Sequence, residues 1–272
     1  MSNQYFDAFL REFSQFEEVD AILLAGSRAN QTNDEHSDYD VYVYLNRELP
    51  VEKRKRVTDA TCSYMELNNQ YWETEDDGVL LDGTPIELIY RGFDWLDGEL
   101  ERVMLHHQAR TGYTTCFWAN LLSSAILYDP KGKAKALQDK YRIPYPQALK
   151  RNIIAKNYPL LKEKMPAYYF QIKKAVQRGD LVSVNHRLTE FLSSYFDILF
   201  AINEYPHPGE KRLLTFAKTR CAKLPEAFER NITTLLHCVG KGGSGMLAEI
   251  EATVAHLDAL LKQEQLFPGA AA

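Results

Sequence analysis

Two acidic residues separated by one position, Asp38 and Asp40, lie in a run of alternating hydrophobic residues, and a Gly26-Ser27 pair precedes them. In a β-strand, residues i and i+2 point to the same face, so this spacing places the two carboxylates side by side. Adjacent carboxylates repel each other unless a cation lies between them, and Mg²⁺ prefers such oxygen ligands. The spacing therefore predicts a metal site that can hold a phosphate-bearing ligand.

A third carboxylate from a neighbouring strand would complete this cluster, and we expect it to be Glu87 in the run PIELIY. The alternation of a strand would turn Ile86 and Leu88 toward the core and Glu87 toward the ligand. Asp82 and Asp94 lie nearby in the sequence and remain alternatives.

Gly26, Ser27 and Arg28 are the residues we expect to bind phosphate oxygens. A glycine at the end of a buried strand lets a ligand approach the backbone, and the amides that follow it and the Ser27 hydroxyl can hold phosphate oxygens. Arg28 is placed to add a charge-assisted contact. A turn or helix N-cap role for Ser27 is compatible with this function.

Hydrophobic spacing in the first half of the chain predicts a helix followed by a mixed sheet. The helix covers residues 3–17, and a helical or partly helical connection follows Pro50. The pair Asp82-Gly83 between two apolar runs predicts a hairpin with a type I′ turn. The expected strands cover residues 19–25, 39–45, 79–81 and 86–90.

From about Pro144 onward the pattern changes to helical periodicity, and residues 181–203 are typical of the central helix of a bundle. The expected fold class is therefore α+β. Residues 1–140 would form a mixed sheet flanked by helices, and residues 141–272 an all-α helical bundle that binds the substrate. Long apolar helices can supply a dimer surface as readily as a core, so a homodimer remains open.

Composition excludes several classes of protein. The formal net charge of −5 argues against a protein that grips nucleic acid through its phosphates. The four cysteines are scattered without metal-ligand spacing, so we expect reduced thiols. The N-terminus lacks a basic start followed by an apolar run, and no stretch reaches the roughly 18 apolar residues of a membrane span. A cytoplasmic location is the resulting expectation, with no membrane partner.

Three residues of the helical half are weaker candidates for ligand contacts. Glu190 is buried in the pattern of the most apolar helix and could contact an acceptor molecule. Tyr168 could stack on a base or an acceptor, although aromatic residues near a helix start commonly belong to the core. Lys211 follows a Pro-Gly break and could reach a phosphate, or could lie in a solvated first turn.

The stretch LLAGSRANQTNDEHSDYDVYVY resembles the signature of the nucleotidyltransferase superfamily typified by DNA polymerase β and the antibiotic nucleotidyltransferases. That signature is a hydrophobic strand, Gly-Ser, about ten residues, and Asp-x-Asp between hydrophobic residues. The run IELIY resembles the third acidic motif of the family. The resemblance is close over residues 20–92, and the helical half is similar in texture to that of two-domain members that modify small molecules.

The resemblance implies that Asp38 and Asp40 bind one or two Mg²⁺ ions together with ATP or another nucleoside triphosphate. Glu87 would be a ligand of the catalytic metal or the general base for the acceptor hydroxyl. The implied reaction moves a nucleoside monophosphate, AMP from ATP, to a hydroxyl of a small molecule such as an aminoglycoside or lincosamide antibiotic. Two alternatives stay open, namely a protein or tRNA acceptor as in toxin-antitoxin systems, and a nucleotide-binding regulator without turnover.

Overall fold

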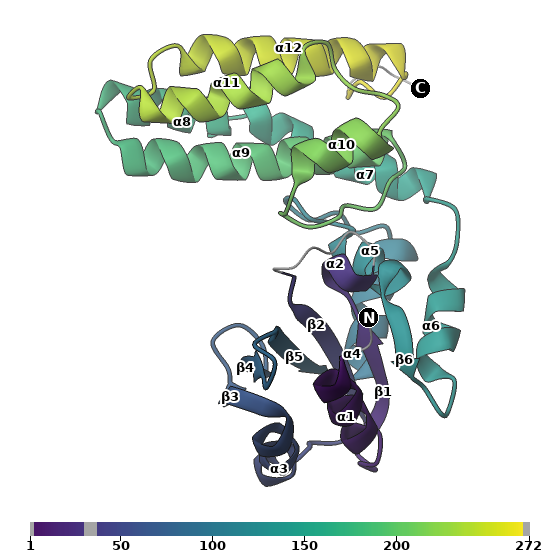
Figure 1. The fold of residues 1–272 in the computed structure, drawn as a ribbon. Coiled ribbons are helices and arrows are strands. Elements are labelled where there is room, and N and C mark those ends of the chain that lie inside the picture. Colours follow the sequence, from purple (N-terminus) through teal and green to yellow (C-terminus); the bar gives the residue numbers. More distant parts are fainter. Residues whose placement is uncertain (1–2, 30–36, 269–272) are drawn as a thin grey trace. The chain divides into compact units, whose positions relative to one another are not determined.

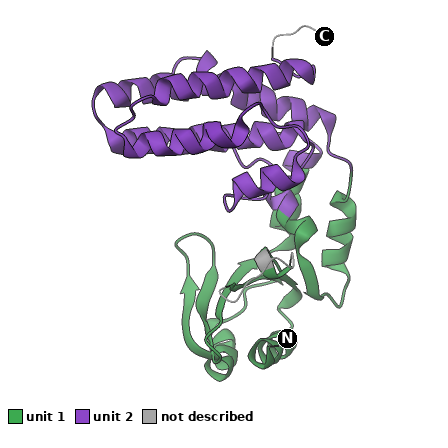
Figure 2. Cartoon of the chain, turned by 45° about the horizontal axis from the view of Figure 1, so that its top comes forward, with its two compact units in different colours: residues 1–101, 120–143 green, residues 102–119, 144–272 purple. Residues whose placement is uncertain are grey.

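The computed structural model describes residues 3–29 and 37–268 of the chain, and its fold class is α+β, as predicted. The chain divides into two compact units (Figure 2). The first unit comprises residues 1–101 and 120–143 and contains the sheet. The second comprises residues 102–119 and 144–272 and is helical.

A six-stranded mixed sheet forms the centre of the first unit (Figure 1). The strands lie in the order β3-β4-β5-β2-β1-β6, and β2 and β5 run parallel while the other neighbouring strands are antiparallel. Their bounds are β1 Val19–Leu24, β2 Tyr39–Leu45, β3 Cys62–Asn69, β4 Glu75–Leu80, β5 Pro85–Arg91 and β6 Ala125–Tyr128.

One face of this sheet carries the apolar core. Phe6, Phe9 and Phe13 of α1 (Gln4–Phe13) pack there, and Phe6 stacks on Tyr39 of β2 with ring centroids 4.0 Å apart. Helix α3 (Val51–Thr61) contributes Val57 to the same cluster. Alternation along β2 and β5 therefore leaves Asp40 and Glu87 on the opposite face, away from these helices.

The remaining helices of the sheet-containing half are α2 (Gly26–Ala29), α4 (Phe93–Met104), α5 (Cys116–Ser123) and α6 (Lys133–Tyr141). Phe93 of α4 stacks on Tyr44, and Asn120 of α5 donates a hydrogen bond to the hydroxyl of Tyr42. Because Tyr42 and Tyr44 alternate with the core residues of β2, these contacts lie on the face that carries Asp40.

The predictions for β3 and for the turn before β5 differ from the structure. Strand β3 was expected to be part of a helical connection, but its mostly polar and exposed residues pair with β4 at the edge of the sheet. The turn before β5 is not type I′, because that turn needs positive φ at both central residues. Only Gly83 has a positive φ (88°), and the loop covers residues 81–84 between the two strands.

The second unit is a bundle of helices around α9 (Leu181–Ile202), the central helix predicted from its apolar pattern. Asp180 begins this helix and accepts a hydrogen bond from the backbone N–H of Ser183. The other elements are α7 Gln147–Tyr158, the π-helix η1 Pro159–Glu163, α8 Tyr168–Gln177, α10 Leu213–Arg220, α11 Phe228–Gly240 and α12 Met246–Gln263.

All four cysteines lie within the described residues and are free. Within the part of the chain that the structure describes, no helix combines the length and the apolar character needed to cross a lipid bilayer.

Asp197 anchors the segment before α5 to the C-terminal half of α9. Its carboxylate is 1% exposed and accepts hydrogen bonds from the backbone N–H and the hydroxyl of Thr114 and from the Asn157 amide. Burial raises the pKa of Asp197 to about 7, although these three donors act in the opposite direction.

This raised pKa predicts a pH-dependent stability. The folded chain holds the Asp197 proton up to about pH 7, whereas the unfolded chain releases it near pH 4. The folded state therefore binds more protons in this range, so the contribution of Asp197 to stability is complete below about pH 4 and is lost as the pH rises to about 7.

We compare the free energy of unfolding of Asp197→Asn with that of the wild type. The substitution itself changes this free energy by a constant amount at every pH. In addition, we expect the difference to shift in favour of Asp197→Asn by on the order of 3 kcal/mol from about pH 4 to pH 8. Urea unfolding of both chains at the two pH values measures this difference. Glu226→Gln, which removes an exposed carboxyl from the same unit, should show no such trend. An equal offset at both pH values for Asp197→Asn would contradict the prediction.

Candidate active site

Four carboxylates lie in one row across the sheet. Asp40 of β2 is paired with Glu87 of β5, and Glu87 is paired with Asp77 of β4. Directly paired residues on neighbouring strands point to the same face, with Cβ atoms about 5 Å apart. The expected neighbour relation between Asp40 and Glu87 is therefore present, and Asp77 of β4 and its own partner Glu66 of β3 extend the row by two strands.

The electrostatics at Glu87 follow from this row. Burial, followed by the charges of Asp40, Asp77, Glu75 and Asp38 in that order, raises the pKa of Glu87 to about 7. A carboxyl that is half-buried among like charges is disfavoured in its ionised form. The site therefore concentrates negative charge around Glu87, and a cation bound there would relieve the repulsion.

Asp38 lies immediately before β2 and is held through its backbone. The Arg28 guanidinium donates hydrogen bonds to the carbonyl oxygens of Asp38 (2.9 Å) and Ser37, and its centre lies 4.1 Å from the centroid of the Tyr39 ring. Arg28 thus fixes the chain where it enters β2. Its predicted contact with a phosphate stays a prediction.

Gly26 packs against the Asp40 carboxylate. It begins α2 with φ of 64°, and a Cβ at this position would lie 1.7 Å from Oδ2 of Asp40. The neighbouring Ala25 N–H donates to the Asp40 carbonyl at 2.8 Å. Only glycine fits here without displacing the carboxylate, both for lack of space and because of the positive φ. Ser27 is the second residue of α2, and its phosphate contact stays a prediction.

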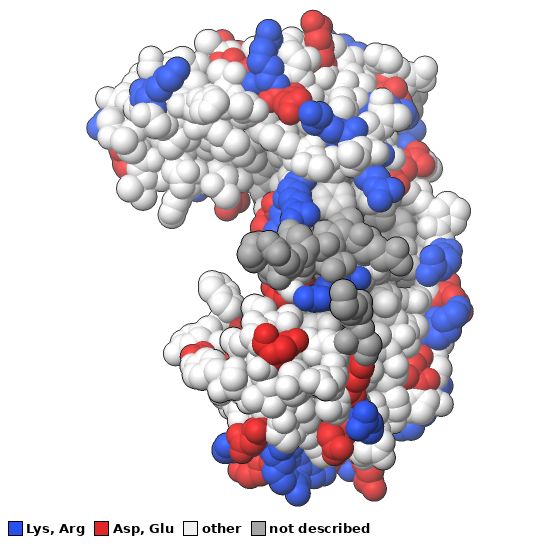
Figure 3. Space-filling view, in the orientation of Figure 1, with Lys and Arg blue, Asp and Glu red and all other residues white. Residues whose placement is uncertain are grey.

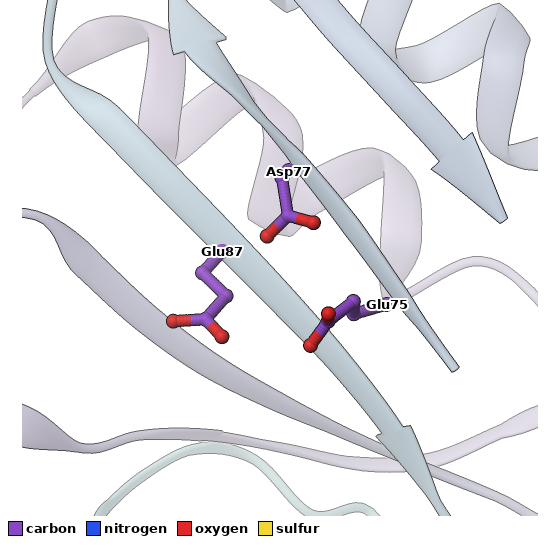
Figure 4. A group of neighbouring side chains, drawn as sticks. All are labelled: Glu75, Asp77 and Glu87. Carbon is purple, nitrogen blue, oxygen red and sulfur yellow. The ribbon is translucent and has the colours of Figure 1, made fainter. Parts of the chain in front are cut away.

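Two acidic residues of β4, Glu75 and Asp77, were missed by the sequence prediction. One carboxylate oxygen from each of Glu75, Asp77 and Glu87 lies within 4.8 Å of the others (Figure 4). The signal that could have found them is the i, i+2 spacing of acidic residues in the run ETEDDG, ahead of the expected hairpin. The sequence prediction began this strand at Val79, so these acids fell outside it.

The alternatives to Glu87 lie elsewhere in the first unit. Asp82 belongs to the β4–β5 loop, where it accepts hydrogen bonds from the Asn3 amide and the Thr84 N–H. Asp94 is exposed in the first turn of α4. Neither is among the main charges that raise the pKa of Glu87.

In the helical unit, Tyr168 is buried in the first turn of α8 and belongs to the hydrophobic core. Glu190 is exposed, so its expected burial is wrong; the buried stripe of α9 runs through Val184, Leu188 and Phe191 and turns Glu190 outward. The charge of Glu190 nevertheless helps to raise the pKa of Tyr168. Lys211 is exposed two residues before α10, and its phosphate contact stays a prediction.

Charge on the visible surface is mixed. Among the described residues seen in Figure 3, Lys and Arg side chains are interspersed with Asp and Glu and form no continuous basic surface. This distribution agrees with the negative net charge.

Comparison with known protein families identifies the class of this chain. Residues 10–92 match the family described as "Polymerase beta, Nucleotidyltransferase", and residues 116–213 match the family described as "Domain of unknown function (DUF4037)". The first match contains Gly26, Asp38, Asp40 and Glu87. The chain therefore carries a nucleotidyltransferase domain of the polymerase β superfamily followed by a DUF4037 region, and the resemblance inferred from its motifs is confirmed.

Three solved structures are similar over nearly the whole chain. A nucleotidyltransferase-like protein from Exiguobacterium sibiricum 255-15 has 11% identity and a TM-score of 0.43, covering 97% of this chain and 75% of that one. An aminoglycoside 6-adenyltransferase from Bacillus subtilis has 11% identity and a TM-score of 0.34, and the match covers 98% of this chain and 93% of that one. The Thermotoga maritima CCA-adding enzyme in complex with tRNA has 12% identity and a TM-score of 0.33, and the match covers 98% of this chain and 83% of that one. No curated protein matches the sequence.

The contact between Gly26 and Asp40 leads to a prediction that separates crowding from backbone strain. Gly26→Ala should weaken binding of Mg²⁺-ATP at least ~10-fold, about 1.4 kcal/mol, because the new methyl group displaces the Asp40 carboxylate. Calorimetric titration of the purified variant measures this loss.

Gly132→Ala is the matched control, because Gly132 has nearly the same φ (68°) and no atom within 4 Å of an added Cβ. This variant should bind like the wild type, and the thermal unfolding of both variants reports the shared strain. If Gly26→Ala binds Mg²⁺-ATP as tightly as the wild type, the proposed coupling of Gly26 to Asp40 is wrong.

Proposed function

We propose that this protein is a Mg²⁺-dependent nucleotidyltransferase that moves AMP from ATP to a hydroxyl group of a small molecule. The observation that supports this proposal most directly is the pairing of Asp40 with Glu87 on adjacent parallel strands, with Gly26 packed against Asp40. All three lie in the segment that matches the polymerase β nucleotidyltransferase family.

The residues present fit the metal that this chemistry uses. Asp38, Asp40 and Glu87 offer oxygen ligands only, which is the preference of Mg²⁺. Burial, followed by the charges of the neighbouring carboxylates, raises the pKa of Glu87, so the ionised cluster is disfavoured in the absence of a cation. When bound, the metal would offset negative charge on the triphosphate and on the attacking and leaving oxygens.

Glu87 is suited to receive a proton from the acceptor. A general base works best when its pKa is near the working pH, and the pKa of Glu87 is raised to about 7. In the proposed step, Glu87 takes the hydroxyl proton while the hydroxyl oxygen forms a bond to the α-phosphorus, and the bond to pyrophosphate breaks. A role for Glu87 as metal ligand is the alternative within the same chemistry.

The rest of the site would serve to position the triphosphate and the acceptor. Gly26 permits close approach to the backbone, Ser27 and Arg28 are the proposed phosphate contacts, and Lys211 is a further proposed contact. Positioning and charge stabilisation supply most of the rate in this type of reaction.

For the acceptor we propose a small molecule of the aminoglycoside or lincosamide kind, bound by the helical unit. Glu190 is the proposed contact, since the other candidate, Tyr168, is packed in the core of this unit. Glu190 supplies an exposed negative charge near Tyr168, which suits an acceptor that carries positive groups.

One experiment separates this proposal from its alternatives. Calorimetry would measure ATP binding with and without Mg²⁺, and pyrophosphate release would then be assayed with aminoglycosides, lincosamides, tRNA and protein acceptors. Release with a small molecule supports the proposal. Release only with tRNA or protein would change the acceptor class, and tight binding without release would indicate a regulator.

The proposed roles predict the effect of removing each carboxylate. Asp38→Asn, Asp40→Asn and Glu87→Gln should each reduce pyrophosphate release by about 100-fold or more, because each removes a group that offsets charge or moves a proton at the reacting centre. Removal of Mg²⁺ with a chelator should abolish release in the wild type.

Asp94→Asn is the control, since Asp94 is exposed at the start of α4 and should leave the rate unchanged. The thermal midpoint of each carboxylate variant should stay equal to that of the wild type or rise, because like-charge repulsion is relieved. Full turnover in both Asp38→Asn and Asp40→Asn would show that the assignment is wrong.

A further inference from the structure

Strand β4 carries acidic side chains on both faces of the sheet, and their hydrogen-bond and ion-pair partners differ between the two faces. On the core face, Asp76 is fully buried and has a complete set of partners. Its carboxylate pairs with the Arg54 guanidinium at 2.6 Å and accepts hydrogen bonds from the Tyr90 hydroxyl and the Asn68 N–H. This is the arrangement expected of a buried charge.

On the other face, Glu75 is also buried but lacks such partners. It is 5% exposed, and among the residues that the structure describes no group donates a hydrogen bond to its carboxylate and no Lys or Arg pairs with it. The charges of Asp77 and Glu73 act on it, and of these two Glu73 is itself paired with Arg91. A buried carboxylate surrounded by like charges is costly unless a cation or a proton neutralises it.

The cluster around Glu75 has the dimensions of a cation site. One oxygen from each of Glu75, Asp77 and Glu87 lies within 4.8 Å of the others (Figure 4). Ligand oxygens on opposite sides of Mg²⁺ or Ca²⁺ lie about 4–5 Å apart, twice the metal–oxygen distance. The Asn69 amide donates to Oδ2 of Asp77 at 3.1 Å, which orients that carboxylate without adding positive charge.

We propose that Glu75, Asp77 and Glu87 form a second divalent-cation site, beside the one that Asp38 and Asp40 contribute to nucleotide binding. The expected ligand is a hard cation of the Mg²⁺, Mn²⁺ and Ca²⁺ class, because all donors are oxygen atoms. Glu87 belongs to both groups, and its two oxygens allow one carboxylate to face two ions. This site would bind its cation without nucleotide and without turnover, so the proposal is tested independently of the proposed function.

Binding of Mn²⁺ alone to the full chain tests this proposal. Electron paramagnetic resonance counts bound Mn²⁺ in the absence of nucleotide, and calorimetry gives its affinity. We expect the wild type to bind Mn²⁺ without nucleotide. The double variant Glu75→Gln, Asp77→Asn should lose one equivalent or bind it at least ~10-fold more weakly, which corresponds to about 1.4 kcal/mol.

Two controls distinguish a ligand from a general negative field. Glu66→Gln removes a charge that acts on Asp77 from the neighbouring strand β3 but lies outside the cluster, so it should retain the equivalent. Asp38→Asn should retain it as well. Glu75→Gln alone serves as a milder variant if thermal unfolding shows that the double variant does not fold.

Several outcomes would overturn the proposal. One is the absence of Mn²⁺ binding to the wild type, which would mean that a proton neutralises Glu75. Another is unchanged binding in the Glu75 and Asp77 variants, and a third is an equal loss in Glu66→Gln. Loss in Asp38→Asn alone would assign the bound ion to the nucleotide site. Pyrophosphate release is measured separately, so its absence would bear only on the proposed function.

Discussion

The parallel pairing of β2 with β5 is the constraint on which the rest of the first unit depends. Its register places Asp40 beside Glu87 on one face and sets Val41 and Leu88 in the core on the other. A slip by one residue would turn the carboxylates of one strand into the core and its apolar residues out, so the core holds the register that brings the acidic residues together. The contacts of α1 and α3 thus position groups that they do not touch.

The acidic face opposes folding, and the structure limits this effect locally. Burial and, after it, the charges of neighbouring carboxylates raise the pKa of Glu87, so the ionised form of this face is disfavoured. Asp76 avoids the cluster because strand alternation turns it to the core face, where Arg54 neutralises it. Gly26 leaves room for Asp40, and Arg28 fixes the backbone of Asp38 instead of neutralising the cluster. A cation bound to this face would relieve the remaining repulsion between its carboxylates.

The sequence was sufficient where local patterns decide the structure. Apolar alternation predicted β2 and β5, the strands that carry Asp40 and Glu87. The sequence was insufficient where the pairing of strands decides the structure. Strand β3 is a polar edge strand with weak apolar alternation. Glu75 and Asp77 lie beside Glu87 only because of the register of β4 with β5. Glu190 was misplaced because the heptad-like stripe of α9 leaves it on the outer side.

If the helical unit binds the acceptor, as we propose, its packing limits which of its groups can do so. Tyr168 is packed in the core of this unit. The Asp197 carboxylate accepts hydrogen bonds from Thr114 and Asn157, and those from Thr114 hold the segment before α5. Groups already engaged in this way cannot bind a ligand without leaving a buried polar atom unsatisfied. Exposed groups such as Glu190 carry no such cost, so acceptor specificity is expected to reside in the exposed side chains of this unit, while its buried polar residues maintain the fold. Substitutions at Asp197 should therefore change stability, whereas substitutions at Glu190 should change the choice of acceptor.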